Sequence, residues 1–146
     1  MPVTSSIGTK LMNDRVFIDT NILVYAHTDV VPDKQLIAQN LIENNNSFIS
    51  VQVLNELANT LSRKYKIDWT DIEKVLLDCI SNNILINNSG TITLAAIALA
   101  NRYRYSFYDC LIIAAALESN CSILYTEDLT DGQTINGLLT ITNPFK

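Results

Sequence analysis

Short apolar runs alternate with longer stretches in which apolar residues recur at helical spacing, from Arg15 to the end of the chain. The short runs predict strands, and the spaced residues predict amphipathic helices. Strands are expected at residues 16–18, 48–49, 84–86 and 122–126, with a candidate edge strand at 138–141. Helices are expected over about 34–43, 50–65, 70–80, 91–103 and 107–117. This alternation predicts an α/β domain with a mostly parallel central sheet flanked by helices.

Polar residues mark where several of these helices begin and end. Pro32-Asp33 is typical of a helix start, and the asparagines at 44–46 are typical of a helix end. Ser50 is a candidate N-cap, and Thr70 with Glu73 forms a capping-box pattern. Ser106 or Asp109 caps the last helix, whose residues 111–117 are entirely apolar. A helix that is apolar nearly all round is expected to be buried.

The 146 residues fit one domain with a sizeable core. We interpret residues 1–14 as a flexible polar leader without the apolar segment of a signal peptide, and 15–146 as the domain. The longest apolar runs, 94–100 and 111–117, fall far short of the ~18–20 residues of a membrane span, so no membrane association is expected. The cysteines, Cys79, Cys110 and Cys121, have no paired spacing and are expected to be core thiols in a reducing cytoplasm.

The net charge and the histidine content argue against two kinds of function, namely non-specific duplex binding and metal binding by a histidine cluster. The net charge of −5 argues against non-specific duplex binding through a uniformly basic surface. The single histidine, His27, cannot form a histidine-based metal cluster and is expected at the surface.

Carboxylates occur where the predicted strands end and helices begin. Asp19 follows the first strand and precedes Thr20 and Asn21, and the strand at 122–126 is followed by Glu127 and Asp128. The carboxyl ends of parallel strands meet at one edge of a sheet, so Asp19 and the acid after 126 are expected in one crevice. Asp109, at the start of the buried helix, and Glu56, on the helix after the second strand, can point into it. Simpler alternatives remain: Asp19 caps a helix, and Glu56 is a solvated glutamate.

Converging carboxylates repel one another unless a cation offsets their charge. Mg²⁺ or Mn²⁺ matches such an oxygen donor set, whereas zinc is disfavoured without cysteine and histidine ligands. Divalent ions in an acidic cleft can promote hydrolysis of a phosphodiester, which is the chemistry of metal-dependent nucleases.

Two basic stretches are candidates for RNA phosphate contacts, although a solvated helix end is the simpler interpretation of the first and the alternative for the second. Arg63, Lys64 and Lys66 surround Tyr65, which could stack on a base. Arg102 and Arg104 end the helix over 91–103.

Four segments, FIDTNILVYA, VLNELANTL, FYDCLIIAAAL and ILYTEDL, resemble in order the acidic motifs of the PIN domain. The resemblance extends from Arg15 to Phe145 and is strongest to the VapC-type toxin ribonucleases of toxin–antitoxin modules. It implies a parallel sheet flanked by helices, an Mg²⁺ or Mn²⁺ site, and cleavage of RNA to leave a 5′-phosphate. The resemblance matches the family's acids to Asp19, Glu56, Asp109 and the more variable Asp128, with Glu127 as a competing fourth acid. Thr20 and Asn21 match residues that orient the first acid, and Thr126 precedes the fourth.

The resemblance further implies a homodimer that pairs with a small antitoxin protein. The main alternative is a catalytically silent PIN-fold module that binds RNA or protein. A receiver domain would need a lysine after the late strand, where Glu127 and Asp128 stand. A phosphatase of the haloacid dehalogenase type would need an aspartate where Asn21 stands.

Overall fold

The computed structural model describes residues 14–146, so the predicted leader lies, apart from Asp14, outside the described residues. Those residues form one sheet with the strand order β3-β2-β1-β4-β6-β5. The strands are β1 (Arg15–Ile18), β2 (Asn46–Ser50), β3 (Ile84–Ile86), β4 (Ile123–Tyr125), β5 (Thr134–Ile135) and β6 (Leu139–Thr142). The expected α/β domain with a mostly parallel sheet is confirmed.

All neighbouring strands pair in parallel except β5, which runs antiparallel to β6. The sequence prediction of an edge strand at 138–141 was wrong in its position, because β6 lies between β4 and β5. Leu139 and Ile141 are fully buried, and β5 takes the edge. Two residues are too few for a recognisable strand pattern, so β5 escaped prediction.

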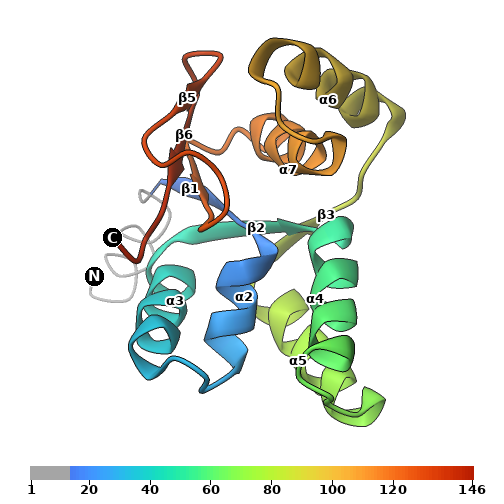
Figure 1. The fold of residues 1–146 in the computed structure, drawn as a ribbon, viewed down its shortest axis with the longest axis vertical. Coiled ribbons are helices and arrows are strands. Elements are labelled where there is room, and N and C mark those ends of the chain that lie inside the picture. Colours follow the sequence, from blue (N-terminus) through green and yellow to red (C-terminus); the bar gives the residue numbers. More distant parts are fainter. Residues whose placement is uncertain (1–13) are drawn as a thin grey trace, which may run out of the picture.

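Six helices flank the sheet in the described part of the chain: α2 (Thr20–His27), α3 (Pro32–Asn44), α4 (Val51–Arg63), α5 (Trp69–Asn82), α6 (Gly90–Tyr103) and α7 (Phe107–Glu118). Helices α2 to α5 lie on one side of the sheet and α6 and α7 on the other (Figure 1). Helix α7 packs against β2 and β4 and is buried along residues 110–116. This placement confirms the prediction from its apolar composition.

The helix caps agree only in part with the sequence patterns. Ser50 and Ser106 are N-caps, and their hydroxyls accept hydrogen bonds from the amides of Val53 and Asp109. Asp109 therefore lies in the first turn of α7 and is not its cap. Helix α5 begins at Trp69, with Asp68 as the N-cap, so the capping box at Thr70 was a wrong prediction. Asp68 was the better acceptor because its carboxylate binds the amide of Asp71.

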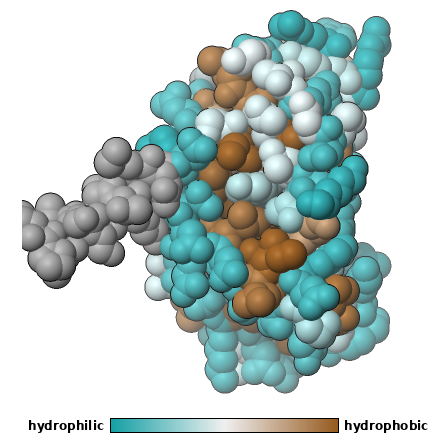
Figure 2. All heavy atoms as spheres, turned by 90° about the vertical axis from the view of Figure 1, so that its left-hand side faces the viewer, coloured by the Kyte–Doolittle hydropathy of each residue, from teal (hydrophilic) through white to brown (hydrophobic). Residues whose placement is uncertain are grey.

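The three cysteines are free and buried, as expected of core thiols. His27 departs from its prediction, because its side chain is only 15% exposed between α2 and α5. The surface carries apolar patches. Figure 2 shows them among hydrophilic side chains on the face that includes α3 and the C-terminal strands. Leu36 and Ile37 on α3 are among the exposed apolar residues. Across residues 14–146, every helix falls short of the length and apolarity that crossing a bilayer requires.

Candidate active site

Asp19 stands at the junction between β1 and α2. Its backbone amide donates to the Tyr125 carbonyl in β4, which extends the pairing of the two parallel strands by one residue. Its carboxylate caps α2, because Oδ1 accepts from the Thr20 amide at 2.7 Å. Burial raises the pKa of Asp19 to about 6, and the nearby charges of Glu56 and Asp128 add to this effect. The sequence interpretation of Asp19 as a helix cap is confirmed, and its carboxylate also lies close to the charges of Glu56 and Asp128.

The fully buried Thr126 hydroxyl connects the acids at the end of β4. It donates to Asp19 Oδ2 at 2.8 Å and accepts from the Asp128 amide at 3.1 Å. The Asn21 side chain donates to Thr126 Oγ1 at 3.3 Å and to Asp128 Oδ2 at 2.9 Å, and its carbonyl accepts from the Glu127 amide at 3.2 Å. Thr126 and Asn21 thus fix the position of Asp128 beside Asp19.

Glu56 approaches the same crevice from α4. Its Oε1 accepts from Thr20 Oγ1 at 3.2 Å and from Gln52 Nε2 at 3.5 Å. Burial raises the pKa of Glu56, and the charge of Asp109 raises it further. Asp109 itself is half-buried at the first turn of α7. The charges of Asp128 and Glu56 act on Asp19, and the charge of Asp109 acts on Glu56, so the acids are neighbours in the order Asp128, Asp19, Glu56 and Asp109.

Glu127 and Asp128 have different surroundings. Glu127 is paired with Lys34 of α3 and accepts from Tyr25 Oη at 2.8 Å. Although burial alone would raise the pKa of Glu127, the hydrogen bonds from Lys34 and Tyr25 lower it. Asp128 has no such cationic partner among residues 14–146 and contacts Asn21. This geometry favours Asp128 as the fourth acid, the choice that the sequence left open.

A cavity of about 360 Å³ lies against these residues. Glu56, Glu127 and Asp128 line it together with Lys64 and Tyr65 from the end of α4. Among the predicted RNA-binding residues Lys64 is thus brought to the acids, whereas Arg63 and Lys66 are exposed beside it. Arg102, at the end of α6, donates to Asn136 Oδ1 at 3.2 Å, and Arg104 follows in a left-handed conformation.

The acids suit a hard cation, although the described residues hold no preformed cluster of three His, Cys, Asp or Glu ligands. Within residues 14–146, no lysine, arginine or histidine forms an ion pair with Asp19, Glu56, Asp109 or Asp128. The available donors are carboxylate oxygens, which Mg²⁺ and Mn²⁺ prefer. Burial is the main cause of the raised pKa of Asp19 and of Glu56, so the ionised forms of both acids would be favoured by a nearby divalent cation.

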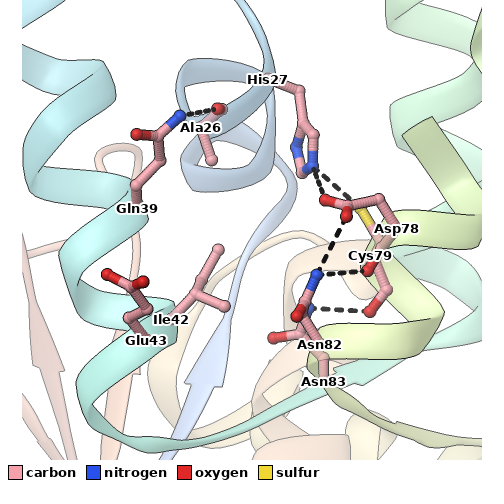
Figure 3. A pocket seen from close by; sticks show the side chains of 9 residues that line it. All are labelled: Ala26, His27, Gln39, Ile42, Glu43, Asp78, Cys79, Asn82 and Asn83. Atoms are coloured by element: carbon pink, nitrogen blue, oxygen red, sulfur yellow. Dashed lines mark hydrogen bonds and ion pairs between the residues drawn. The ribbon is translucent and has the colours of Figure 1, made fainter.

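A second cavity of about 340 Å³ lies between α2, α3 and α5 (Figure 3). His27 Nδ1 is 3.0 Å from the Leu23 carbonyl, and Nε2 is 3.0 Å from Asp78 Oδ2 and 3.9 Å from Cys79 Sγ. Burial raises the pKa of the Cys79 thiol to about 12, so this thiol is not a nucleophile at neutral pH. His27 ends α2 whereas Asp19 caps its start, which places this cavity away from the acids.

Sequence reasoning missed three residues that support the site. Gln52 contacts Glu56, and Lys34 with Tyr25 binds Glu127. Gln52 lies one helical turn before Glu56, a spacing that would have revealed their contact. No sequence signal connects Lys34 to Glu127, because 93 residues separate them.

Comparison with known proteins identifies the class. The family model of the PIN domain matches residues 16–130, so this chain belongs to the PIN domain family. Its fold is also similar to that of toxins solved in complex with their antitoxins, as the sequence resemblance predicted. A search of curated proteins gave no match.

Three solved structures illustrate the similarity of this chain to known folds. A toxin–antitoxin complex from Klebsiella pneumoniae has a TM-score of 0.65 and 24% identity, over 88% of this chain and 97% of that one. VapBC2 from Rickettsia felis, bound to a DNA fragment from its promoter, has a TM-score of 0.60 and 25% identity, over 78% of this chain and 88% of that one. Mycobacterium tuberculosis VapC20, described as a sarcin-ricin loop cleaving toxin, has a TM-score of 0.64 and 16% identity, over 77% and 91%.

Proposed function

We propose that this chain is a metal-dependent endoribonuclease that hydrolyses RNA phosphodiester bonds in the cytoplasm as the toxin of a toxin–antitoxin pair. The observation that carries the proposal is a series of acids that interact pairwise, Asp128 with Asp19, Asp19 with Glu56 and Glu56 with Asp109, and that have no cationic partner in the described residues. Membership of the PIN family and the likeness to VapC-type toxins support it.

The four acids would hold Mg²⁺ or Mn²⁺. When bound, such an ion lowers the pKa of a coordinated water and offsets the charge that develops on the leaving oxygen. Thr126 and Asn21 orient Asp19 and Asp128 through their hydrogen bonds, and Thr20 with Gln52 orients Glu56. Fixed orientation of ligands is worth about 10–100-fold in metal affinity or activity at comparable sites.

The basic end of α4 would bind the RNA backbone. Lys64 shares the cavity with Glu56 and Asp128, so a phosphate held by Lys64 would lie next to the acids. Tyr65 in the same cavity offers a ring on which a base can stack. Arg63 and Lys66 would extend this contact, and Arg102 with Arg104 would bind more distant phosphates.

A small antitoxin protein and a second copy of the chain are the proposed protein partners. The likeness to toxins solved in complexes supports the antitoxin. An acidic crevice is complementary to a basic side chain, which would block it by pairing with the carboxylates. Exposed apolar residues such as Leu36, Trp69 and Leu94 provide surface that protein partners can cover.

The test is cleavage of end-labelled cellular RNA by the purified chain with Mg²⁺ or Mn²⁺, with chelator, and beside Asp109→Asn. We expect discrete products that require the metal, and a loss of several orders of magnitude in Asp109→Asn, because this variant lacks a charged ligand. Asp71→Asn is the matched control, since Asp71 likewise lies in the first turn of a helix, α5, but away from the crevice.

Cleavage by Asp109→Asn at the parent rate would overturn the site assignment. Metal-independent cleavage would contradict the proposed chemistry. RNA binding without cleavage or metal binding would favour a catalytically silent RNA-binding module.

A further inference from the structure

A third cavity, of about 660 Å³, adjoins the acids on another side of Glu56. Glu56 lines both this cavity and the one that contains Lys64, so it stands between them. The residues that line the third cavity come from α4, from the loop after β3 and from the start of α7. A chain that passes the acids at Glu56 can therefore reach both cavities.

The third cavity combines an aromatic ring with apolar and amide side chains. Tyr108 is 66% exposed although it is a large aromatic residue, and Val51 and Leu111 give the cavity apolar walls. Asn55, Asn87 and Asn88 add amide groups, which both donate and accept hydrogen bonds. Among residues 14–146, no lysine or arginine lines this cavity, so it is not built to hold a phosphate.

The hydrogen bonds of Gln52 indicate which kind of ligand group would suit this cavity, namely one that donates a hydrogen bond. Its Nε2 is occupied by the Tyr108 carbonyl at 3.2 Å and by Glu56 at 3.5 Å. Its Oε1 is buried and has no hydrogen-bond partner in the described part of the chain. Leaving a buried acceptor unpaired is costly. Because Oε1 is closed to solvent in this arrangement, the Gln52 amide would have to turn toward the cavity before a donor group of a ligand could satisfy it.

We propose that this cavity binds one unstacked nucleobase of the RNA, adjacent to the phosphate that lies at the acids. The Tyr108 ring stacks on the base, and the amides of Gln52, Asn55, Asn87 and Asn88 contact its edge. A nucleobase has the required chemistry, namely an apolar face and an edge with donors and acceptors. The inference rests on the proposed ribonuclease function and assigns to it a base-specificity site.

The first test measures binding of the base alone. Adenosine, guanosine, cytidine and uridine are titrated into the full chain in chelator and followed by NMR chemical shifts. Nucleosides carry no phosphate, so neither the metal nor the cations at the end of α4 contribute, and the dependence on Tyr108 distinguishes this cavity from the one that contains Tyr65. We expect one or two nucleosides to bind, and Tyr108→Ala to weaken them about 5- to 150-fold, as removal of base stacking does elsewhere. Tyr108→Phe should retain binding. Trp69→Ala is the control, because Trp69 is equally exposed but lines no described cavity.

The second test measures base preference at the cut. RNA with one randomised position on either side of a cleaved bond should show a preference on one side only. Asn55→Ala should change that preference, whereas Asn59→Ala, one turn further along α4 and outside the cavity, should not.

The outcomes separate this inference from the proposed function. Tyr108-dependent nucleoside binding without RNA cleavage would uphold the base site and reject the nuclease. Cleavage by the parent chain, with nucleoside binding absent or unchanged in Tyr108→Ala, would uphold the nuclease and overturn the base site. A base preference that is unchanged in both Tyr108→Ala and Asn55→Ala would overturn it as well.

Discussion

At the scale of single residues, Asp19 combines a structural and an electrostatic role. One carboxylate oxygen caps α2 while the other accepts from Thr126, so the side chain is held in place on both sides. Its charge is nevertheless unfavourable, because burial and the neighbouring acids raise its pKa from 3.8 to about 6. A residue placed in this way lowers the stability of the protein at neutral pH while it fixes the geometry of the crevice.

The raised pKa of Asp19 predicts a pH dependence of stability. Between pH 4 and 6 the folded state holds a proton on Asp19 that the unfolded state has lost, so this residue's contribution to stability falls as the pH rises. The fall amounts to about 3 kcal/mol at 1.36 kcal/mol for each pKa unit. Asp19→Asn cannot titrate and should therefore gain stability relative to the parent over this range. Urea unfolding in chelator at pH 4 to 7 measures the difference.

The exposed acid Asp33 of α3 provides the control for this prediction, since Asp33→Asn should run parallel to the parent across the same pH range. A parallel curve for Asp19→Asn would mean that the Asp19 carboxylate is not perturbed by its surroundings.

Thr126→Val should damage both stability and activity. The substitution keeps the shape of the buried side chain but removes a hydroxyl that bonds Asp19 and the Asp128 amide and accepts from Asn21. We expect a loss of about 1–3 kcal/mol in the free energy of unfolding and of about 10–100-fold in RNA cleavage. Denaturant unfolding and single-turnover cleavage measure the two effects. Thr126→Ser, which keeps the hydroxyl, should restore most of both, and equal losses in the two variants would assign the effect to packing.

At the scale of elements, the strands and helices that could be predicted are those with strong local signals. The apolar run of β1 and the spaced leucines of α4 determine their own structure, because burial favours one arrangement of each. Helix α2 was not predicted as a separate element, because its apolar residues 22–26 form a short unbroken run without helical spacing. The position of β6 inside the sheet depends on its pairing with β4 and β5, which local sequence does not encode.

The start of α5 gives a prediction at this scale. Asp68 accepts from the Asp71 amide at 2.9 Å, so Asp68→Ala should lower the free energy of unfolding by about 1 kcal/mol. Thr70→Ala should be nearly neutral, because Thr70 lies inside the helix and is exposed. Denaturant unfolding of both variants distinguishes the two candidate caps. A larger loss of unfolding free energy in Thr70→Ala than in Asp68→Ala would favour the capping box that the sequence suggested.

At the scale of the whole molecule, charge is unevenly distributed. The net charge of −5 disfavours contact with RNA, whereas the end of α4 concentrates three cations beside the acidic crevice. Attraction at one end and repulsion elsewhere would orient a polyanion on this protein.

Removing the cations at the end of α4 should therefore weaken RNA binding and reduce its dependence on salt. The variant combines Arg63→Gln, Lys64→Gln and Lys66→Asn, since Lys66 has φ 57°, a conformation that asparagine tolerates. Because the variant can neutralise three fewer phosphates, the slope of log K against log salt should become shallower by about 2. Fluorescence anisotropy with single-stranded RNA measures it. Lys74→Gln, on α5 near Asp71, is the control, and an unchanged slope in the triple variant would identify the cluster as a solvated helix end.

The sequence allowed the acids of the candidate site to be proposed, but it did not predict the contacts that these acids and their neighbours make with distant segments. Asp19, Asp109 and Asp128 follow from where strands end and helices begin. The pairing of Glu127 with Lys34, which separates it from Asp128, arises only once α3 packs beside α2. The cavity beside Glu56 likewise unites α4, the loop after β3 and α7, which are far apart in the sequence. Such contacts between distant segments depend on the complete fold.

The hydrogen bond between Thr126 and Asp19 also has a consequence for the order of events during synthesis. These residues are 107 positions apart, so the ribosome adds Thr126 about 5–20 s after Asp19. Until then β1 has no β4 beside it, and neither Thr126 nor Asp128 exists to complete the crevice. A growing or truncated chain that ends before β4 would lack part of the proposed catalytic centre. On the proposed function, the cell would therefore be exposed to the nuclease only when translation of its message is nearly finished.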